Sequence, residues 1–132
     1  MIKSTLTRAS ESERAEQVIR QTDIPAIELT KGASARLVVT PGATVSLVEQ
    51  GPYSELPRHR HEQDEVILVL EGERDEALDG RLYHIAAGDI IYVPSGAEHG
   101  ALTYGSRCKA IEISAPARED LVTKLEALLD RL

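Results

Sequence analysis

Short apolar runs separated by turn residues fill the chain from residue 24 to residue 114, and this spacing limits the fold more than any other feature. The runs are rich in Val, Ile and Leu, which favour strands, and each is closed by Gly, Pro, Asp or Ser. They cover residues 27–29, 35–40, 44–49, 65–70, 81–85, 90–93 and 110–113. Strands at this spacing predict an all-β sandwich or barrel over about residues 24–115, with a tight hairpin turn at Asp79-Gly80.

Two helices are predicted outside this region. Ser10 followed by Glu13 has the spacing of a capping box, so a short helix is predicted over about residues 10–21. The alternative is a frayed polar tail, because Ala15, Val18 and Ile19 form only a thin apolar stripe.

The second helix is predicted over about residues 117–131, where apolar residues follow helical spacing. We expect the stripe to be largely buried against the outside of the barrel or a second subunit. A position on a membrane surface is not expected, because the polar face carries both charge signs. The stripe consists of Leu121, Val122, Leu125, Leu128, Leu129 and Leu132.

Length and charge exclude several classes of protein. A chain of 132 residues fits one domain, expected to span residues 1–132. The net charge of -7 opposes binding to the negatively charged phosphate backbone, so no nucleic-acid partner is expected. The single cysteine, Cys108, excludes an intrachain disulfide and is interpreted as a small buried hydrophobe. No apolar run suits a signal or a membrane span, so we expect a cytoplasmic protein without membrane contact.

A His-x-His pair, His59 and His61, lies where the chain is predicted to be extended. Side chains two apart on a strand share one face, about 6.6 Å from each other, so both rings can reach one ion. Glu65 would lie about 13 Å further on a straight strand, so a turn is expected at residues 62–64. A second turn, at residues 94–96, would bring His99 close to His59 and His61. The tripeptide alone would equally fit two exposed or hydrogen-bonded core histidines.

Two motifs at fixed spacing resemble those of the cupin family. The first reads His59, His61, Glu65 and Gly72, and the second reads Gly88, Pro94, Gly96 and His99. Tyr53 replaces the usual glycine of the first motif, and Thr103 replaces the usual asparagine of the second.

The resemblance implies a double-stranded β-helix, a jelly-roll barrel that holds one divalent transition-metal ion through His59, His61, Glu65 and His99. Such ligands suit Fe, Mn, Ni, Co or Zn and leave open positions for water or substrate. The alternative is a cupin barrel whose metal site is lost. The resemblance also implies a homodimer paired through N-terminal strands.

The C-terminal segment resembles that of the pectin-degradation cupins that convert unsaturated uronates to their linear form. There, an acid and an arginine line the pocket at positions held here by Glu112 and Arg118. An arginine binds a carboxylate with two parallel bonds, and an acid near a metal-bound oxygen can move a proton. Alternatively, Glu112 is a solvated strand residue and Arg118 a surface charge. Alternation places Glu112 inside only if Ile111 and Ile113 pack outward, under the C-terminal helix.

These observations favour a metal-dependent enzyme that acts on a small oxygen-rich molecule. Uronate-type ring opening or isomerisation is the leading hypothesis, with a dioxygenase close behind. The alternative is a non-catalytic module that binds or senses a small ligand. His84 lies outside both motifs, so a surface or hydrogen-bonded role is expected for it.

Overall fold

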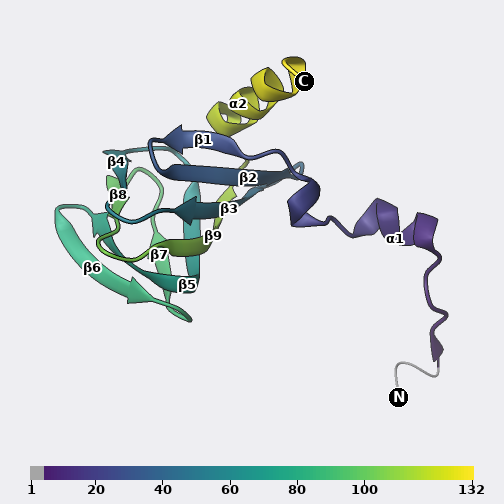
Figure 1. Cartoon of the computed structure of the whole chain (residues 1–132), viewed down its shortest axis with the longest axis horizontal. Helices are drawn as coiled ribbons and strands as arrows, with labels where there is room; N and C mark the ends of the chain where they lie inside the picture. Colours follow the sequence, from purple (N-terminus) through teal and green to yellow (C-terminus); the bar gives the residue numbers. More distant parts are fainter. Residues whose placement is uncertain (1–4) are drawn as a thin grey trace.

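The apolar runs form antiparallel strands that curl into a nearly closed barrel in the computed structural model, which describes residues 5–132 (Figure 1). This confirms the predicted all-β jelly-roll fold. Strands β4 and β8 lie outside the predicted runs, because their sequences are short and partly polar. The strands are β1 (Ile27–Thr30), β2 (Ala33–Val39), β3 (Thr44–Gln50), β4 (Glu55–His59), β5 (Asp64–Leu78), β6 (Arg81–Ala86), β7 (Ile90–Val93), β8 (His99–Leu102) and β9 (Cys108–Ala115).

Strand β5 organises the barrel because it pairs with four other strands. Its first half pairs with β9 and β7, and its second half pairs with β6 and β8. The two halves meet at a bulge between Val69 and Glu71, next to Gly72. Gly72 has a φ of 74°, and a Cβ there would overlap the carbonyl oxygen of Arg107. Only glycine fits this close approach, which explains its place in the motif.

The predicted turn at Asp79-Gly80 joins β5 to β6. Leu78 pairs with Arg81, so the loop has two residues. Both loop residues have positive φ, 46° and 82°, as a hairpin turn matched to the strand twist requires.

Helix α1 (Glu11–Gln17) begins at the predicted capping box. The Glu13 amide donates to Ser10 Oγ at 3.2 Å, and the Ser10 amide donates to Glu13 Oε1 at 2.9 Å. The helix is shorter than predicted, because Val18 is already extended. A short 3-10 turn, η2 (Gln21–Asp23), then leads to β1. All residues from 5 to 23 are exposed, and this N-terminal arm stands away from the barrel (Figure 1).

Helix α2 (Glu119–Asp130) packs against β1 and β2. The barrel buries Leu121 and partly buries Val122, Leu125 and Leu128, whereas Leu129 is 48% and Leu132 84% exposed. Burial of the rest of the stripe against a second subunit stays a prediction. The helix contacts the barrel at β1 and β2 and leaves Ile113 44% exposed, so it is not the cover expected for the outer face of β9. Among residues 5–132, no helix is long and apolar enough to span a membrane.

Candidate metal centre

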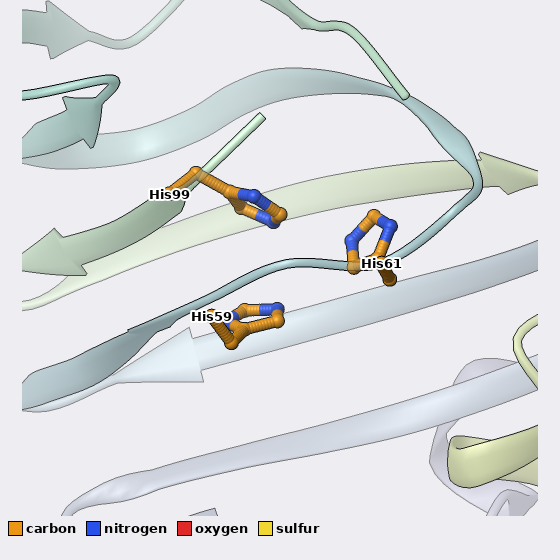
Figure 2. Close-up of side chains that lie close together, drawn as sticks. All are labelled: His59, His61 and His99. Atoms are coloured by element: carbon orange, nitrogen blue, oxygen red, sulfur yellow. The ribbon is translucent and has the colours of Figure 1, made fainter. Parts of the chain in front are cut away.

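Three histidine rings converge at one end of the barrel (Figure 2). His59 ends β4, His99 begins β8, and the two are paired across the strands. His61 follows on the connection to β5, where the chain bends at residues 62 and 63, inside the predicted turn. Ring centroids lie 4.4 Å apart for His59 and His99 and 4.7 Å apart for His61 and His99. One nitrogen from each ring lies within 4.8 Å of the others, close enough for one ion.

Each ring is oriented in the same way by a backbone carbonyl two residues away. Nδ1 of His59 lies 3.0 Å from Pro57 O, Nδ1 of His61 3.2 Å from Gln63 O, and Nδ1 of His99 3.0 Å from Ala97 O. A carbonyl only accepts hydrogen bonds, so Nδ1 carries the proton in each ring. In its neutral form each ring would then present the lone pair of Nε2, as metal ligands do.

Glu65 adds a carboxylate to the same centre from the start of β5. Its Oε2 lies 3.1 Å from His99 Nε2 and 3.5 Å from His61 Nε2. Among the described residues, Glu65 Oε2 and His61 Nε2 are buried with no hydrogen-bond partner. Ser114 Oγ lies 3.5 Å from the other carboxylate oxygen. The structure thus brings the four predicted ligands together, and the two atoms without a partner, His61 Nε2 and Glu65 Oε2, face each other at 3.5 Å.

Acceptors that face one another in a buried site require a positive charge between them. A proton on His99 is one source. Burial lowers the pKa of His99, but its hydrogen bonds with Glu65 and the Ala97 carbonyl and the negative charges of Glu65 and Glu76 together outweigh this, and the pKa is raised. Burial likewise raises the pKa of Glu65, and the bonds with His61 and His99 reverse this to hold it well below its usual range. A divalent ion is the other source, and the donor set fits one.

Glu112 lies on the inner face of β9, beside this centre. The alternation along β9 predicted this position on the condition that Ile111 and Ile113 face outward. Cys108, Ala110 and Ser114 on the same face are buried. Arg74 Nη2 donates to Glu112 Oε2 at 3.1 Å and to Glu76 Oε1 at 2.8 Å. Arg74 and Glu76 are 1% and 2% exposed.

Sequence reasoning missed Arg74 and Glu76, because they stand in a continuous charged run, Glu73 to Glu76, beyond the strand predicted at residues 65–70. Arg74 lies between the carboxylates of Glu76 and Glu112, and Glu65 adds a third carboxylate to the barrel interior. If all three were ionised, the set would carry an excess of two negative charges. Burial raises the pKa of Glu76 to about 8 and also raises the pKa of Glu112, despite the charge of Arg74. Protons or a divalent cation must neutralise the excess, which is a second reason why the site fits such an ion.

A cavity of about 510 Å³ opens beside the centre, between the barrel and α2. Arg118, the residue before α2, lies at its edge, and its guanidinium is held by the carboxylate of Asp120. The polar lining includes His59, His61, Glu65, Glu112, Arg60, Arg118, Asp120 and Lys124. The apolar lining includes Leu29, Ala35, Val48, Leu56, Pro57 and Leu121. The cavity therefore joins the histidine centre to both residues of the C-terminal segment singled out above.

The structure also shows where the other residues singled out in the sequence lie. Cys108 is buried, as expected, and His84 is exposed with Nδ1 3.0 Å from Asp75 Oδ1. Tyr53 has a φ of 51°, which explains why glycine is usual there. Thr103 Oγ1 accepts from the Ser54 amide at 2.9 Å. Both departures from the motifs are accommodated in the loops beyond β3 and β8, away from the histidines.

Several known proteins are similar to this chain. A family model described as the cupin domain matches residues 46–114. The dimethylsulfoniopropionate lyase DddW of Ruegeria pomeroyi is 40% identical over 58 residues, which are 44% of this chain and 38% of that protein. The match thus spans well under half of this curated relative.

Solved structures support the fold. An RmlC-like cupin from Shewanella frigidimarina superposes with a TM-score of 0.74 at 24% identity, over 80% of this chain and 95% of that one. KdgF from Halomonas sp. superposes with a TM-score of 0.71 at 22% identity, over 77% of this chain and 94% of that one. At these identities the similarity establishes the fold.

Proposed function

This chain belongs to the cupin domain family, and on that premise we propose that it is a metal-dependent enzyme acting on a small oxygen-rich molecule. The observation that carries the proposal is the convergence of three histidine rings and the Glu65 carboxylate beside a cavity of about 510 Å³, with His61 Nε2 and Glu65 Oε2 buried and without a hydrogen-bond partner. Cavities of this size hold small-molecule ligands. The proposed ligands are Nε2 of His59, His61 and His99 and a carboxylate oxygen of Glu65. When bound, the ion would supply Lewis-acid polarisation of a substrate oxygen.

Glu112 is proposed to hold or move a proton on its carboxylate. It lines the cavity together with Glu65 and two of the histidines. Burial raises its pKa, which favours the protonated form more than in an exposed carboxyl. Arg74 fixes Oε2 through its hydrogen bond, so the other oxygen, Oε1, is proposed as the atom that meets substrate.

Arg118 is proposed to bind a carboxylate of the substrate. Its side chain is 11% exposed, and Asp120 already occupies Nε and Nη2. Asp120 holds the guanidinium plane in place, and Nη1 remains for a substrate oxygen. Such preorganisation lowers the entropy lost when substrate binds.

Uronate-type ring opening or isomerisation is the leading reaction. Its support is the C-terminal segment, which resembles that of the pectin-degradation cupins, together with the fold shared with KdgF, a pectin-degradation protein. A uronate offers a carboxylate for Arg118 and ring oxygens for the centre. A dioxygenase is the second candidate, favoured by the apolar walls formed by Leu29, Val48 and Leu56, which suit a substrate with an apolar body.

The test compares substrates under controlled oxygen. The protein is loaded anaerobically with Fe(II), Mn(II), Ni(II), Co(II) or Zn(II) and given an unsaturated uronate, or dimethylsulfoniopropionate because of the match to DddW. We expect the uronate to disappear without oxygen and His61→Ala to abolish the reaction. Oxygen uptake coupled to substrate loss would support a dioxygenase instead. Tight ligand binding without turnover by any metal form would contradict an enzyme and favour a sensing module.

A further inference from the structure

Gln63 is a buried polar residue in the turn that joins His61 to Glu65. It is 7% exposed, whereas Glu62 and Asp64 on either side of it are exposed. Polar side chains in turns normally face water, and a buried amide needs partners for its hydrogen-bonding groups. The partners of Gln63 therefore show which parts of the molecule this turn connects.

Two groups of Gln63 contact two different segments of the chain. Its backbone carbonyl oxygen lies 3.2 Å from Nδ1 of His61. Its side-chain Nε2 donates to Ala117 O at 3.1 Å. A carbonyl only accepts hydrogen bonds, so the amide presents its nitrogen there. Ala117 O belongs to the peptide that joins residue 117 to Arg118, the residue proposed to bind a carboxylate. One residue thus contacts both the histidine centre and the backbone next to Arg118.

The side chain of Gln63 continues a connection that the backbone ends. Strands β5 and β9 pair as far as Asp64 with Ala115. Pro116 follows, and it cannot extend the ladder because it has no N–H. Residues 116–118 then lie between β9 and α2, in neither strand nor helix. The hydrogen bond from Gln63 attaches this short connection to the turn.

The turn is itself held from its other side, by the loop at residues 94–96. The Gly96 amide donates to His61 O at 2.9 Å. The Ser95 amide donates to Asp64 Oδ1, also at 2.9 Å. Hydrogen bonds at both ends of the turn fix its backbone next to the centre. The turn therefore provides a fixed point to which Gln63 can hold another segment.

Arg118 has no comparable support toward the histidines. Its guanidinium is held by Asp120, two residues further along the same segment, so the pair moves with the start of α2. Helix α2 packs against β1 and β2, where Leu121 joins the apolar cluster. Among residues 5–132, the hydrogen bond from Gln63 is the one that joins residues 116–118 to the histidine side of the cavity.

We propose that Gln63 is a positioning residue that sets Arg118 relative to the metal centre. Its carbonyl orients His61, and its side chain holds the peptide that precedes the Arg118 side chain. The inference rests on the proposed function, because it concerns how the same site aims its carboxylate-binding residue. Since one residue contacts both segments, order at the centre is coupled to order at the start of α2, and the coupling is reciprocal.

The test measures hydrogen exchange of the full chain with and without Zn(II), together with the Zn(II) content per chain. At free Zn(II) about 100 times its Kd, linkage slows exchange by up to about 100-fold, and we expect about 10-fold or more over residues 117–123 of the wild type. Gln63→Met keeps the backbone carbonyl and the side-chain length but lacks the donor. It should still bind Zn(II) stoichiometrically and lose the slowing over residues 117–123.

Glu62→Ala is the matched control, because it truncates an exposed side chain in the same turn, and it should keep the slowing. A wild type that binds Zn(II) without slowing exchange over residues 117–123 would overturn the inference. So would a Gln63→Met variant that shows the same slowing as the control. A wild type that binds no Zn(II) would refute the proposed metal centre, and the inference with it.

Calorimetry of the Zn(II)-loaded protein with D-galacturonate, as the carboxylate probe, gives a second readout. Arg118→Met and Gln63→Met should each raise the Kd by about 10-fold or more, because the guanidinium is lost in one and no longer preorganised in the other. A loss of affinity in Arg118→Met alone would refute the positioning role. An unchanged Kd in Arg118→Met would refute the proposed role of Arg118 itself.

Folding of each variant is checked by circular dichroism. Gln63→Met is expected to fold, because Leu121 still packs α2 on the barrel. If it does not fold, Gln63→Glu replaces it in both measurements. This side chain has the same shape, and at about pH 8 it is ionised and cannot donate to Ala117 O. The expected losses are the same, and a Gln63→Glu variant that behaves like the control would overturn the inference.

Discussion

Arg74 Nη2 lies 3.1 Å from Glu112 Oε2, so a guanidinium inside the barrel holds the carboxylate that faces the cavity. Arg74 reaches it from the second half of β5, whereas Glu65, in the metal centre, comes from the first half. One strand therefore supplies a proposed metal ligand and the residue that orients the proposed proton carrier. Experiments can therefore test the proposed roles of Glu65 and Glu112 separately.

Glu112→Gln should leave metal binding unchanged and reduce turnover by about 10² to 10⁴, because the amide keeps the shape but cannot exchange the proton. The measurement pairs metal stoichiometry with the rate of substrate loss. Glu119→Gln, on the exposed first turn of α2, serves as the control. Turnover that survives in Glu112→Gln would remove Glu112 from the proposed chemistry.

Above about pH 8, where Glu76 is ionised, Arg74→Met should lower the free energy of unfolding by about 3–5 kcal/mol, since it leaves Glu76 buried without its cation. The double variant Arg74→Met with Glu76→Gln should recover part of this loss, because no unpaired charge then remains on that pair. Denaturant unfolding of both variants measures the difference. Equal stability of the single and double variants would contradict a buried ion pair.

The metal-free protein should lose stability as pH rises. Burial raises the pKa of Glu76 from 4.5 to about 8, so the folded chain binds a proton more tightly than the unfolded chain between these values. The contribution is therefore fully present below about pH 4.5 and is lost as pH rises through about 8. Urea unfolding of chelator-treated protein should show this decline, and Glu76→Gln should flatten it. An unchanged slope in the variant would assign the decline to other groups.

Leu121→Ala should destabilise the chain by about 2–5 kcal/mol, because Leu121 packs in the cluster of Ile27, Leu37 and Val48. Leu132→Ala should have no measurable effect, since this side chain is 84% exposed. Melting temperatures of the two variants give the comparison. Similar losses would mean that the end of α2 is covered in solution.

The sequence predicted the barrel and the convergence of His59, His61, Glu65 and His99, because turn residues and fixed motif spacing are local signals. It did not predict Arg74 and Glu76, because the inward face changes within β5. Counting alternate residues from Glu65 would place 73 and 75 inside, but the bulge after Val69 shifts the alternation by one residue. Such a bulge depends on the partner strand and is invisible in the strand's own pattern.

Helix α2 shows a different limit. Its apolar stripe predicted one buried face, yet periodicity states only that a face exists and not how far the barrel extends beneath it. The contacts with β1 and β2 bury Leu121 and leave Leu129 half exposed.

Metal content tests the central claim most directly. The protein is purified without chelators, loaded with each divalent ion, separated from free metal and analysed for metal per chain. The account predicts one equivalent for the wild type and loss of stoichiometric binding for His61→Ala, with His84→Ala, outside the centre, unchanged. A wild type that retains no metal, or a His61→Ala variant that retains one full equivalent, would contradict it.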